Sequence, residues 1–94
     1  MIKIDTERHE VTIDGKEIVF AKKEFDLLAL LFAAKGKTVQ RADIFEAVWG
    51  EADEAGIDSR RIDQHVARIR RKLGRRATML RTVPKRGYKF AAKA

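Results

Sequence analysis

Hydrophobic and polar positions alternate near the start of the chain. Val11 and Ile13 have polar neighbours on both sides, and Ile18 and Phe20 resume the alternation after the dipeptide Asp-Gly at 14–15. Alternation is typical of a strand that buries one face, and Asp-Gly is a strong signal for a two-residue hairpin turn. The pattern predicts a small antiparallel sheet at the N-terminus.

The period then changes to that of a helix. Apolar residues recur every three or four positions over residues 22–34, and Gly36 is a typical C-terminal stop. A second helix is predicted over the run RADIFEAVWG (41–50), with Gly50 as its stop. The positions expected to face the core from these two helices are Phe25, Leu27, Leu28, Leu30, Leu31, Phe32, Ile44, Phe45 and Val48.

A third helix is predicted over about 58–74. Ile62, Val66, Ile69 and Leu73 are spaced by four, three and four positions, so at about 100° per residue they lie on one narrow stripe. This stripe is expected to pack on the core. The remaining positions, opposite the stripe or at its edges, are Arg60, Arg61, Asp63, Gln64, His65, Ala67, Arg68, Arg70, Arg71 and Lys72.

The last segment, residues 77–92, is predicted to be a β-hairpin. Apolar and β-forming residues flank the turn sequence PKRG (84–87). The order is then a small sheet (1–20), three helices (22–74) and a hairpin, with no linker or repeat between them. The sequence therefore predicts one α+β domain over residues 1–94.

Charge divides the chain into two unlike halves. Residues 1–57 carry eight basic and twelve acidic side chains, whereas residues 58–94 carry thirteen basic and two acidic ones. The outward face of the third helix is rich in arginine, which suits bidentate recognition of phosphates and guanine edges. Asp63, the acid in the interior of that helix, is expected to pair with a neighbouring arginine. This asymmetry indicates a polyanionic partner.

Other function classes find little support in the sequence. The two histidines, His9 and His65, are far apart, and cysteine and a glycine-rich phosphate loop are absent. The carboxylates of DEAGID (53–58) have the spacing of neither a calcium loop nor an acid/base pair. We therefore expect no enzyme, no metal site and no cofactor.

A membrane partner is not expected either. An interfacial helix needs a free apolar face, whereas the stripe of the third helix is narrow and is needed for the core. The longest apolar run, residues 27–34, is far too short to span a bilayer, and the N-terminus is charged from Lys3 onwards, unlike a signal peptide. The expected location is cytoplasmic.

Four stretches of sequence resemble the OmpR/PhoB-type DNA-binding domain of bacterial response regulators. They are KEFDLLALL, VQRADIFEAVWG, SRRIDQHVARIRRKLG and LRTVPKRGYKF, and the resemblance extends over nearly the whole chain. It implies a winged helix-turn-helix domain of a two-component transcriptional regulator, associated with the nucleoid. The third helix (about 58–74) would enter the major groove of DNA, and the hairpin wing (about 84–87) the minor groove.

The resemblance also implies roles for particular residues. Base contacts are expected from Gln64, Arg68 and Arg61, and glutamine suits adenine as arginine suits guanine. Phosphate contacts are expected from Trp49, Arg60, His65, Arg70, Arg71, Thr82 and Tyr88. Lys85 and Arg86 would reach the minor groove. The resemblance further implies direct repeats bound by head-to-tail dimers, and contact of RNA polymerase with loop 50–57 through Glu51, Asp53 and Glu54.

Two departures from the family pattern alter these expectations. Many members have RGxGY in the wing, where this chain has PKRGY, so the wing is closer to the ToxR/CadC-type branch. The hydroxyl that usually caps the first helix is replaced by Ala21, a loss of about 1 kcal/mol of stability. An alternative function is a stand-alone winged helix that binds RNA or protein, although aromatic stacking platforms for RNA bases are lacking.

Overall fold

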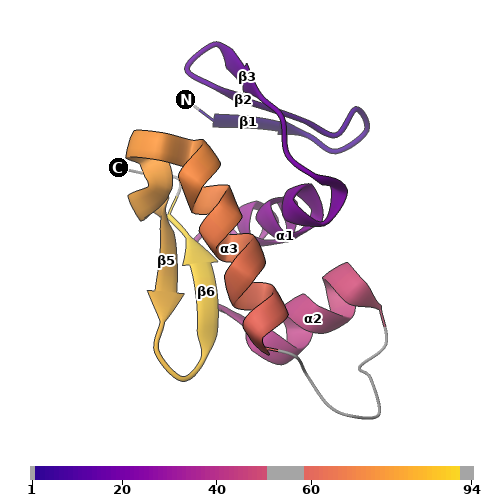
Figure 1. The fold of residues 1–94 in the computed structure, drawn as a ribbon, viewed down its shortest axis with the longest axis vertical. Coiled ribbons are helices and arrows are strands. Elements are labelled where there is room, and N and C mark those ends of the chain that lie inside the picture. Colours follow the sequence, from indigo (N-terminus) through magenta and orange to yellow (C-terminus); the bar gives the residue numbers. More distant parts are fainter. Residues whose placement is uncertain (1, 51–58, 92–94) are drawn as a thin grey trace.

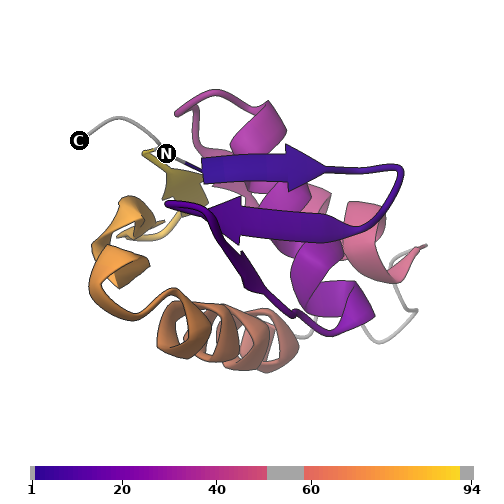
Figure 2. The same ribbon diagram turned by 90° about the horizontal axis from the view of Figure 1, so that it is seen from above.

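The computed structural model describes residues 2–50 and 59–91, and its first element is the expected small sheet. Strands β1 (Ile2–Asp5), β2 (Glu10–Ile13) and β3 (Lys16–Ile18) are antiparallel in the order β1-β2-β3. The turn residues Asp14 and Gly15 have φ values of 51° and 82°, as the expected two-residue turn requires. Figure 2 shows this sheet lying over α1.

The return strand is shorter than predicted. Its pairing with β2 stops at the pair Val11–Ile18, and without a partner strand the chain leaves the sheet and turns towards α1. Phe20 therefore lies beyond the strand, half-buried, and Val19 is 77% exposed. The prediction of Phe20 as a strand residue was wrong, because alternation alone does not show where pairing ends.

The three helices match their predicted positions closely. They are α1 (Lys22–Ala33), α2 (Arg41–Trp49) and α3 (Ser59–Leu73), with Asp58 outside the described residues. Gly50 ends α2 with a φ of 90°, and its N–H donates to the carbonyl of Glu46 at 2.9 Å. Such a positive φ favours glycine at a helix end.

The N-terminus of α1 is capped in a different way from the family pattern. Ala21 has no side-chain acceptor, but its own N–H donates to Oε1 of Glu24 at 3.0 Å. This bond is one half of a capping box, formed without the hydroxyl half. One of the exposed donors at the start of α1 is therefore satisfied in spite of the alanine.

A 3-10 helix and a second sheet complete the fold. The 3-10 helix η1 (Gly74–Met79) reverses the chain between α3 and the hairpin. The hairpin strands are β5 (Leu80–Val83) and β6 (Gly87–Phe90), and β4 (Val39–Gln40) pairs with β6 in the order β4-β6-β5. The predicted hairpin start at residue 77 was wrong, since residues 77–79 belong to η1.

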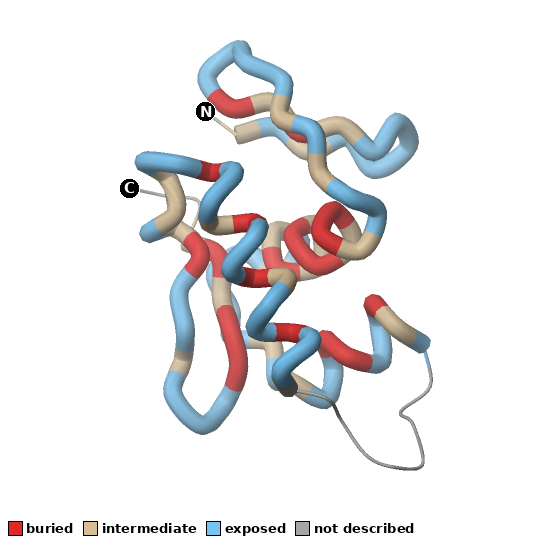
Figure 3. Tube along the Cα trace, viewed as in Figure 1, coloured by how far each residue is buried: buried red, intermediate tan, exposed pale blue. Residues whose placement is uncertain are grey.

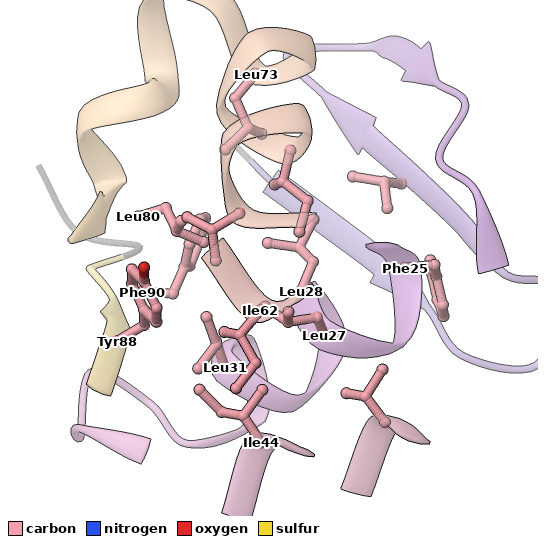
Figure 4. Packing of buried hydrophobic residues seen from close by; sticks show 14 of the residues in the cluster. Phe25, Leu27, Leu28, Leu31, Ile44, Ile62, Leu73, Leu80, Tyr88 and Phe90 are labelled. Carbon is pink, nitrogen blue, oxygen red and sulfur yellow. The ribbon is translucent and has the colours of Figure 1, made fainter. Parts of the chain in front are cut away.

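The core lies between the N-terminal sheet, the three helices and the second sheet (Figures 1 and 3). Figure 4 shows side chains of α1, α3, β5 and β6 meeting there, among them Leu28, Ile62, Leu80 and Phe90. Of the predicted inward positions, Leu30 and Phe32 are half-buried and the others are buried. Figure 1 also shows the hairpin beside α3, which is the arrangement of a winged helix-turn-helix domain, so the predicted fold class is confirmed.

Candidate nucleic-acid interface

The third helix has one buried and one exposed face. Ile62, Val66, Ile69 and Leu73 are at most 5% exposed, and they belong to the core that α3 forms with α1, α2 and the second sheet. Figure 3 shows buried and exposed segments alternating along α3. The exposed positions of the helix are Arg60, Arg61, Asp63, Gln64, Ala67, Arg68, Arg71 and Lys72. The expected two-sided character of this helix is therefore present, with arginines and one glutamine facing outwards.

An aromatic contact joins α2 to the N-terminal half of α3. The ring of Trp49 lies edge-on to that of His65, with centroids 4.9 Å apart, and stacks on Phe45 at 5.5 Å. Nδ1 of His65 lies 2.8 Å from the carbonyl oxygen of Arg61, so this nitrogen carries the proton. Both Trp49 and His65 are half-buried. They form a partly exposed edge where the two helices meet.

Asp63 joins three elements of the fold. Its Oδ1 accepts hydrogen bonds from Nη1 of Arg41 in α2 at 2.7 Å and from the hydroxyl of Tyr88 in β6 at 2.5 Å. The arginine that pairs with Asp63 is thus 22 residues away in sequence. Tyr88 is buried, and its ring lies 5.0 Å from the guanidinium carbon of Arg41 and 5.8 Å from that of Arg70.

The pKa values of this cluster reflect its hydrogen bonds. Partial burial disfavours the carboxylate of Asp63, but the bonds from Tyr88 and Arg41 outweigh burial and lower its pKa below the ordinary value. Burial and the bond to the Asp63 carboxylate raise the pKa of Tyr88, and the bond to Asp63 raises that of Arg41. Around neutral pH the cluster therefore holds a carboxylate between a phenol and a guanidinium.

Arg70 connects α3 to the wing. Its Nε and Nη2 donate to the carbonyl oxygen of Leu80 at 3.1 and 2.8 Å, and Nη2 also donates to Oγ1 of Thr82 at 2.9 Å. Two of the residues expected to bind phosphate, Arg70 and Thr82, are thus bonded to each other. The guanidinium satisfies groups of the edge strand β5 that would otherwise face solvent.

The tip of the wing is a tight turn that carries two cations. The N–H of Arg86 donates to the carbonyl of Val83 at 3.0 Å, and Lys85 has a φ of 64°. With Pro84 at the second position, this is the pattern of a type II turn. Lys85 and Arg86 are both exposed. Figure 1 shows this turn and the N-terminal end of α3 at the same end of the molecule.

The wing is held by α2 as well as by α3. The N–H of Arg41, the first residue of α2, donates to the carbonyl of Arg86 at 3.2 Å. Gly87 packs so closely on β4 that a Cβ there would lie 3.0 Å from Cα of Gln40 and far inside van der Waals contact of the Val39 carbonyl oxygen. The wing is consequently positioned by both helices of the helix-turn-helix.

Sequence reasoning missed Arg41 as a member of the site. The sequence does contain a signal for Arg41. A cation at the first position of a helix faces the positive end of the helix dipole and therefore needs a compensating partner. Sequence alone does not identify that partner. The expected polymerase-contact residues Glu51, Asp53 and Glu54 lie outside the described residues.

Two features are absent from the described part of the chain. Among residues 2–50 and 59–91, no three histidine, aspartate or glutamate side chains gather as metal ligands would. Over the same residues, no helix has the length and apolar character needed to cross a bilayer.

Comparisons with known proteins agree with this geometry. The family model described as "Transcriptional regulatory protein, C terminal" matches residues 15–90. Sensory transduction protein RegX3 of Mycolicibacterium smegmatis is 40% identical over 72 residues, which are 77% of this chain and 31% of that protein. Probable transcriptional regulator ycf27 of Cyanophora paradoxa is also 40% identical, with 77% and 30% covered. The chain thus spans about a third of the length of these curated relatives.

Solved structures show the same fold. The Klebsiella pneumoniae RstA DNA-binding domain in complex with the RstA box has a TM-score of 0.82 and 27% identity, with 96% of this chain and 90% of that chain covered. The DNA-binding domain of CpxR from E. coli has a TM-score of 0.81 and 29% identity, with 95% and 88% covered. The chain therefore belongs to the family of C-terminal, OmpR/PhoB-type domains of transcriptional regulatory proteins, which are DNA-binding domains and not enzymes.

Proposed function

We propose that residues 1–94 act as one domain that binds specific double-stranded DNA sequences for a transcriptional regulator. The main observation in support is the outward face of α3, where Gln64, Arg68 and Arg71 are exposed on a helix whose opposite side is buried in the core. A helix held in this way can enter the major groove, which is wide enough to admit one. The similarity to the RstA DNA-binding domain, which was solved in complex with the RstA box, supports DNA binding by this domain.

Base reading is assigned to Gln64, Arg68 and Arg61. Arginine donates two parallel hydrogen bonds to O6 and N7 of guanine, and glutamine pairs in the same manner with N6 and N7 of adenine. Ala67 is exposed beside these residues, and its small side chain permits close approach to the base edges. Specificity then depends on two or three side chains in the N-terminal two thirds of α3.

Phosphate contacts flank this reading surface. They come from Arg60 and Arg71 on α3, from the partly exposed edge formed by Trp49 and His65, and from the hydroxyl of Thr82. Arg70 and Tyr88 already use donors within the protein, so they support the interface mainly by position. Such contacts orient the domain and supply sequence-independent affinity.

The wing supplies the minor-groove contact through its exposed turn. Lys85 and Arg86 lie at the tip, and arginine is favoured in narrow, A·T-rich minor grooves by the enhanced negative potential there. Arg86 is the residue assigned to the groove. Pro84 takes the place of the arginine of the commoner RGxGY wing, and the positive charge is displaced to Lys85 and Arg86, as in the ToxR/CadC-type branch.

Assembly and partners follow from the family. The domain binds direct repeats as a head-to-tail dimer, and it works in the cytoplasm at the nucleoid. Loop 50–57, with Glu51, Asp53 and Glu54, contacts RNA polymerase. These parts of the proposal rest on the family resemblance and on the acidic sequence of the loop.

The deciding experiment measures binding to duplex DNA at two salt concentrations and selects bound sequences from a random duplex pool. Affinity should fall steeply as salt rises, because each neutralised phosphate releases counterions, and selection should return a repeated motif. Binding that is insensitive to salt would contradict the proposal. Preference for single-stranded RNA, or for a protein without DNA, would favour the alternative function.

A further inference from the structure

The acid in the middle of a cationic DNA-binding surface needs an explanation. Asp63 is the single acidic residue in the sequence of α3, and it lies next to the proposed base reader Gln64. About half of its side-chain surface is exposed. A carboxylate here repels the phosphates of DNA and therefore weakens non-specific binding. We therefore expect the carboxylate of Asp63 to have a structural role that compensates for this weaker binding.

The contacts of Asp63 show what its carboxylate organises. One oxygen, Oδ1, receives both the guanidinium of Arg41 and the hydroxyl of Tyr88. Arg41 begins α2, Asp63 lies in the first half of α3, and Tyr88 is in wing strand β6. One atom thus connects the two helices of the helix-turn-helix with the wing.

A backbone bond carries this connection to the tip of the wing. The N–H of Arg41 donates to the carbonyl of Arg86, and Arg86 is the proposed minor-groove residue. The side chain of Arg41 is thus held by Asp63 while its backbone holds the turn of the wing. Asp63 and Arg86 are coupled through a single intervening residue, although neither touches the other in the contacts described.

We infer that Asp63 is a positioning residue that sets the wing relative to α3, so that major-groove reading and minor-groove contact occur in one geometry. Arg41 and Tyr88 transmit this setting, and Arg70 reinforces it from the other side through Leu80 and Thr82. The inference rests on the proposed function and adds to it a residue that determines specificity without contacting a base.

The direction in which Asp63→Asn changes DNA affinity distinguishes a positioning role from a purely electrostatic one. Removing the acid with Asp63→Asn lowers the repulsion from DNA, so a purely electrostatic role predicts tighter binding to every duplex. A positioning role predicts weaker binding to the selected duplex with unchanged or tighter binding to a scrambled one. The ratio of the two affinities should fall about tenfold, because the neutral amide oxygen accepts the bonds from Arg41 and Tyr88 more weakly than the carboxylate does.

Two further variants make this comparison robust. Tyr88→Phe removes only the hydroxyl and keeps the buried ring, so it should lower the ratio in the same direction while the domain stays folded. Asp26→Asn makes the same chemical change on α1, where Asp26 pairs with Lys22 at 3.3 Å, and should leave the ratio unchanged. Circular dichroism melting of each variant checks that it is folded under the conditions of binding.

A double-mutant cycle with Arg86→Ala tests the coupling itself. If Asp63 positions the wing, Arg86→Ala should reduce affinity for the selected duplex several-fold less in the Asp63→Asn background than in the wild type. Independent losses, in which the two fold-changes simply multiply, would overturn the inference. Tighter binding of Asp63→Asn to both duplexes in equal measure would overturn it as well.

Amide hydrogen exchange in the free domain separates this inference from the proposed function. Asp63→Asn should speed exchange at the amide of Arg41 and through β6, and leave the amides of β2 in the N-terminal sheet unchanged. Unchanged exchange at Arg41 and β6 would refute the positioning role whatever the DNA measurements give. Failure of the wild-type domain to bind duplex DNA would instead refute the proposed function, and the exchange data would still decide the role of Asp63.

Discussion

The ammonium group of Lys72, near the end of α3, lies 2.7 Å from Oε1 of Glu24 in the first turn of α1. Glu24 is only 3% exposed, and the same oxygen accepts the N–H of Ala21. Lys72 Nζ also lies 5.5 Å from the centre of the Phe20 ring. This buried carboxylate thus stabilises the start of α1 and ties it to the proposed DNA-reading helix.

The Glu24 carboxylate should make the stability of the domain depend on pH. Burial raises its pKa, but the bonds from Lys72 and from the Ala21 N–H outweigh burial, so the pKa in the folded state lies below the ordinary value of 4.5. Its stabilising contribution is therefore present above pH 4.5 and is lost as the pH falls through the folded-state value. Glu24→Gln should lower the free energy of unfolding at pH 7 by about 1–2 kcal/mol.

Urea unfolding of the wild type and Glu24→Gln at pH 7 and pH 3 measures this dependence. The difference between the two proteins should narrow at pH 3. Glu46→Gln, at an exposed position of α2, is the control and should change stability little. A Glu24→Gln difference of equal size at both pH values would contradict the assigned role of the carboxylate.

Gly87 should tolerate no side chain. Its φ is not in the left-handed region, so the restriction comes from the close approach of the Val39 carbonyl oxygen. Gly87→Ala forces β4 and β6 apart and should destabilise the domain by about 3 kcal/mol. Gly15→Ala is the matched comparison: it meets no atom within 4 Å but has a φ of 82°, for which about 1 kcal/mol is expected. Thermal melting measures the loss of stability in both variants. Equal losses of stability in Gly87→Ala and Gly15→Ala would contradict the proposed crowding at Gly87.

Lys85 should contribute to DNA binding at a cost in stability. Its φ of 64° is strained for a residue with a side chain, so Lys85→Gly should raise the free energy of unfolding by about 0.5–1 kcal/mol. The same change removes a wing cation and should weaken DNA binding. Lys35→Gly is matched to it, since Lys35 has a φ of 52° in the turn after α1. It should stabilise the domain without affecting DNA affinity, as measured by melting and by gel shift. Equal loss of DNA affinity in both variants would contradict a specific contact between Lys85 and DNA.

Arg68 and Arg71 should differ in what they recognise. Arg68→Ala is expected to cost about 1–3 kcal/mol on the selected duplex and to relax preference at one base pair. Arg71→Ala should weaken binding to all duplexes and reduce the salt slope by about one unit. Titrations of selected and scrambled duplexes at several salt concentrations distinguish the two outcomes. If Arg68→Ala weakened binding to all sequences equally, Arg68 would be a phosphate contact instead.

Much of the fold could be predicted because its signals are local. The stripe of Ile62, Val66, Ile69 and Leu73 specifies which side of α3 is buried wherever that helix packs, and the turn at Asp14-Gly15 depends on backbone chemistry within two residues. The limits of strands were less predictable. The end of β3 and the start of β5 depend on whether a partner strand continues, which alternation does not indicate.

The candidate site was likewise predictable only in part: the exposed positions could be predicted, but the partners of the charged residues could not. The outward positions of Gln64, Arg68 and Arg71 follow from helical periodicity, and the structure has them exposed as predicted. The partners of the charged residues do not follow from periodicity. Asp63 pairs with Arg41 and not with an arginine of its own helix, and Arg70 bonds to the backbone of β5.

The family, the helices and the cationic face were therefore predictable from the amino-acid sequence, since periodicity, turn chemistry and charge are properties of neighbouring residues. The meeting of α2, α3 and the wing at Asp63 emerged only from the folded arrangement of these elements. An ion pair or hydrogen bond between long side chains forms over a few ångströms, and the crossing of helices and the pairing of β4 with β6 set those distances. These relationships arise between elements far apart in sequence, so no local pattern contains them.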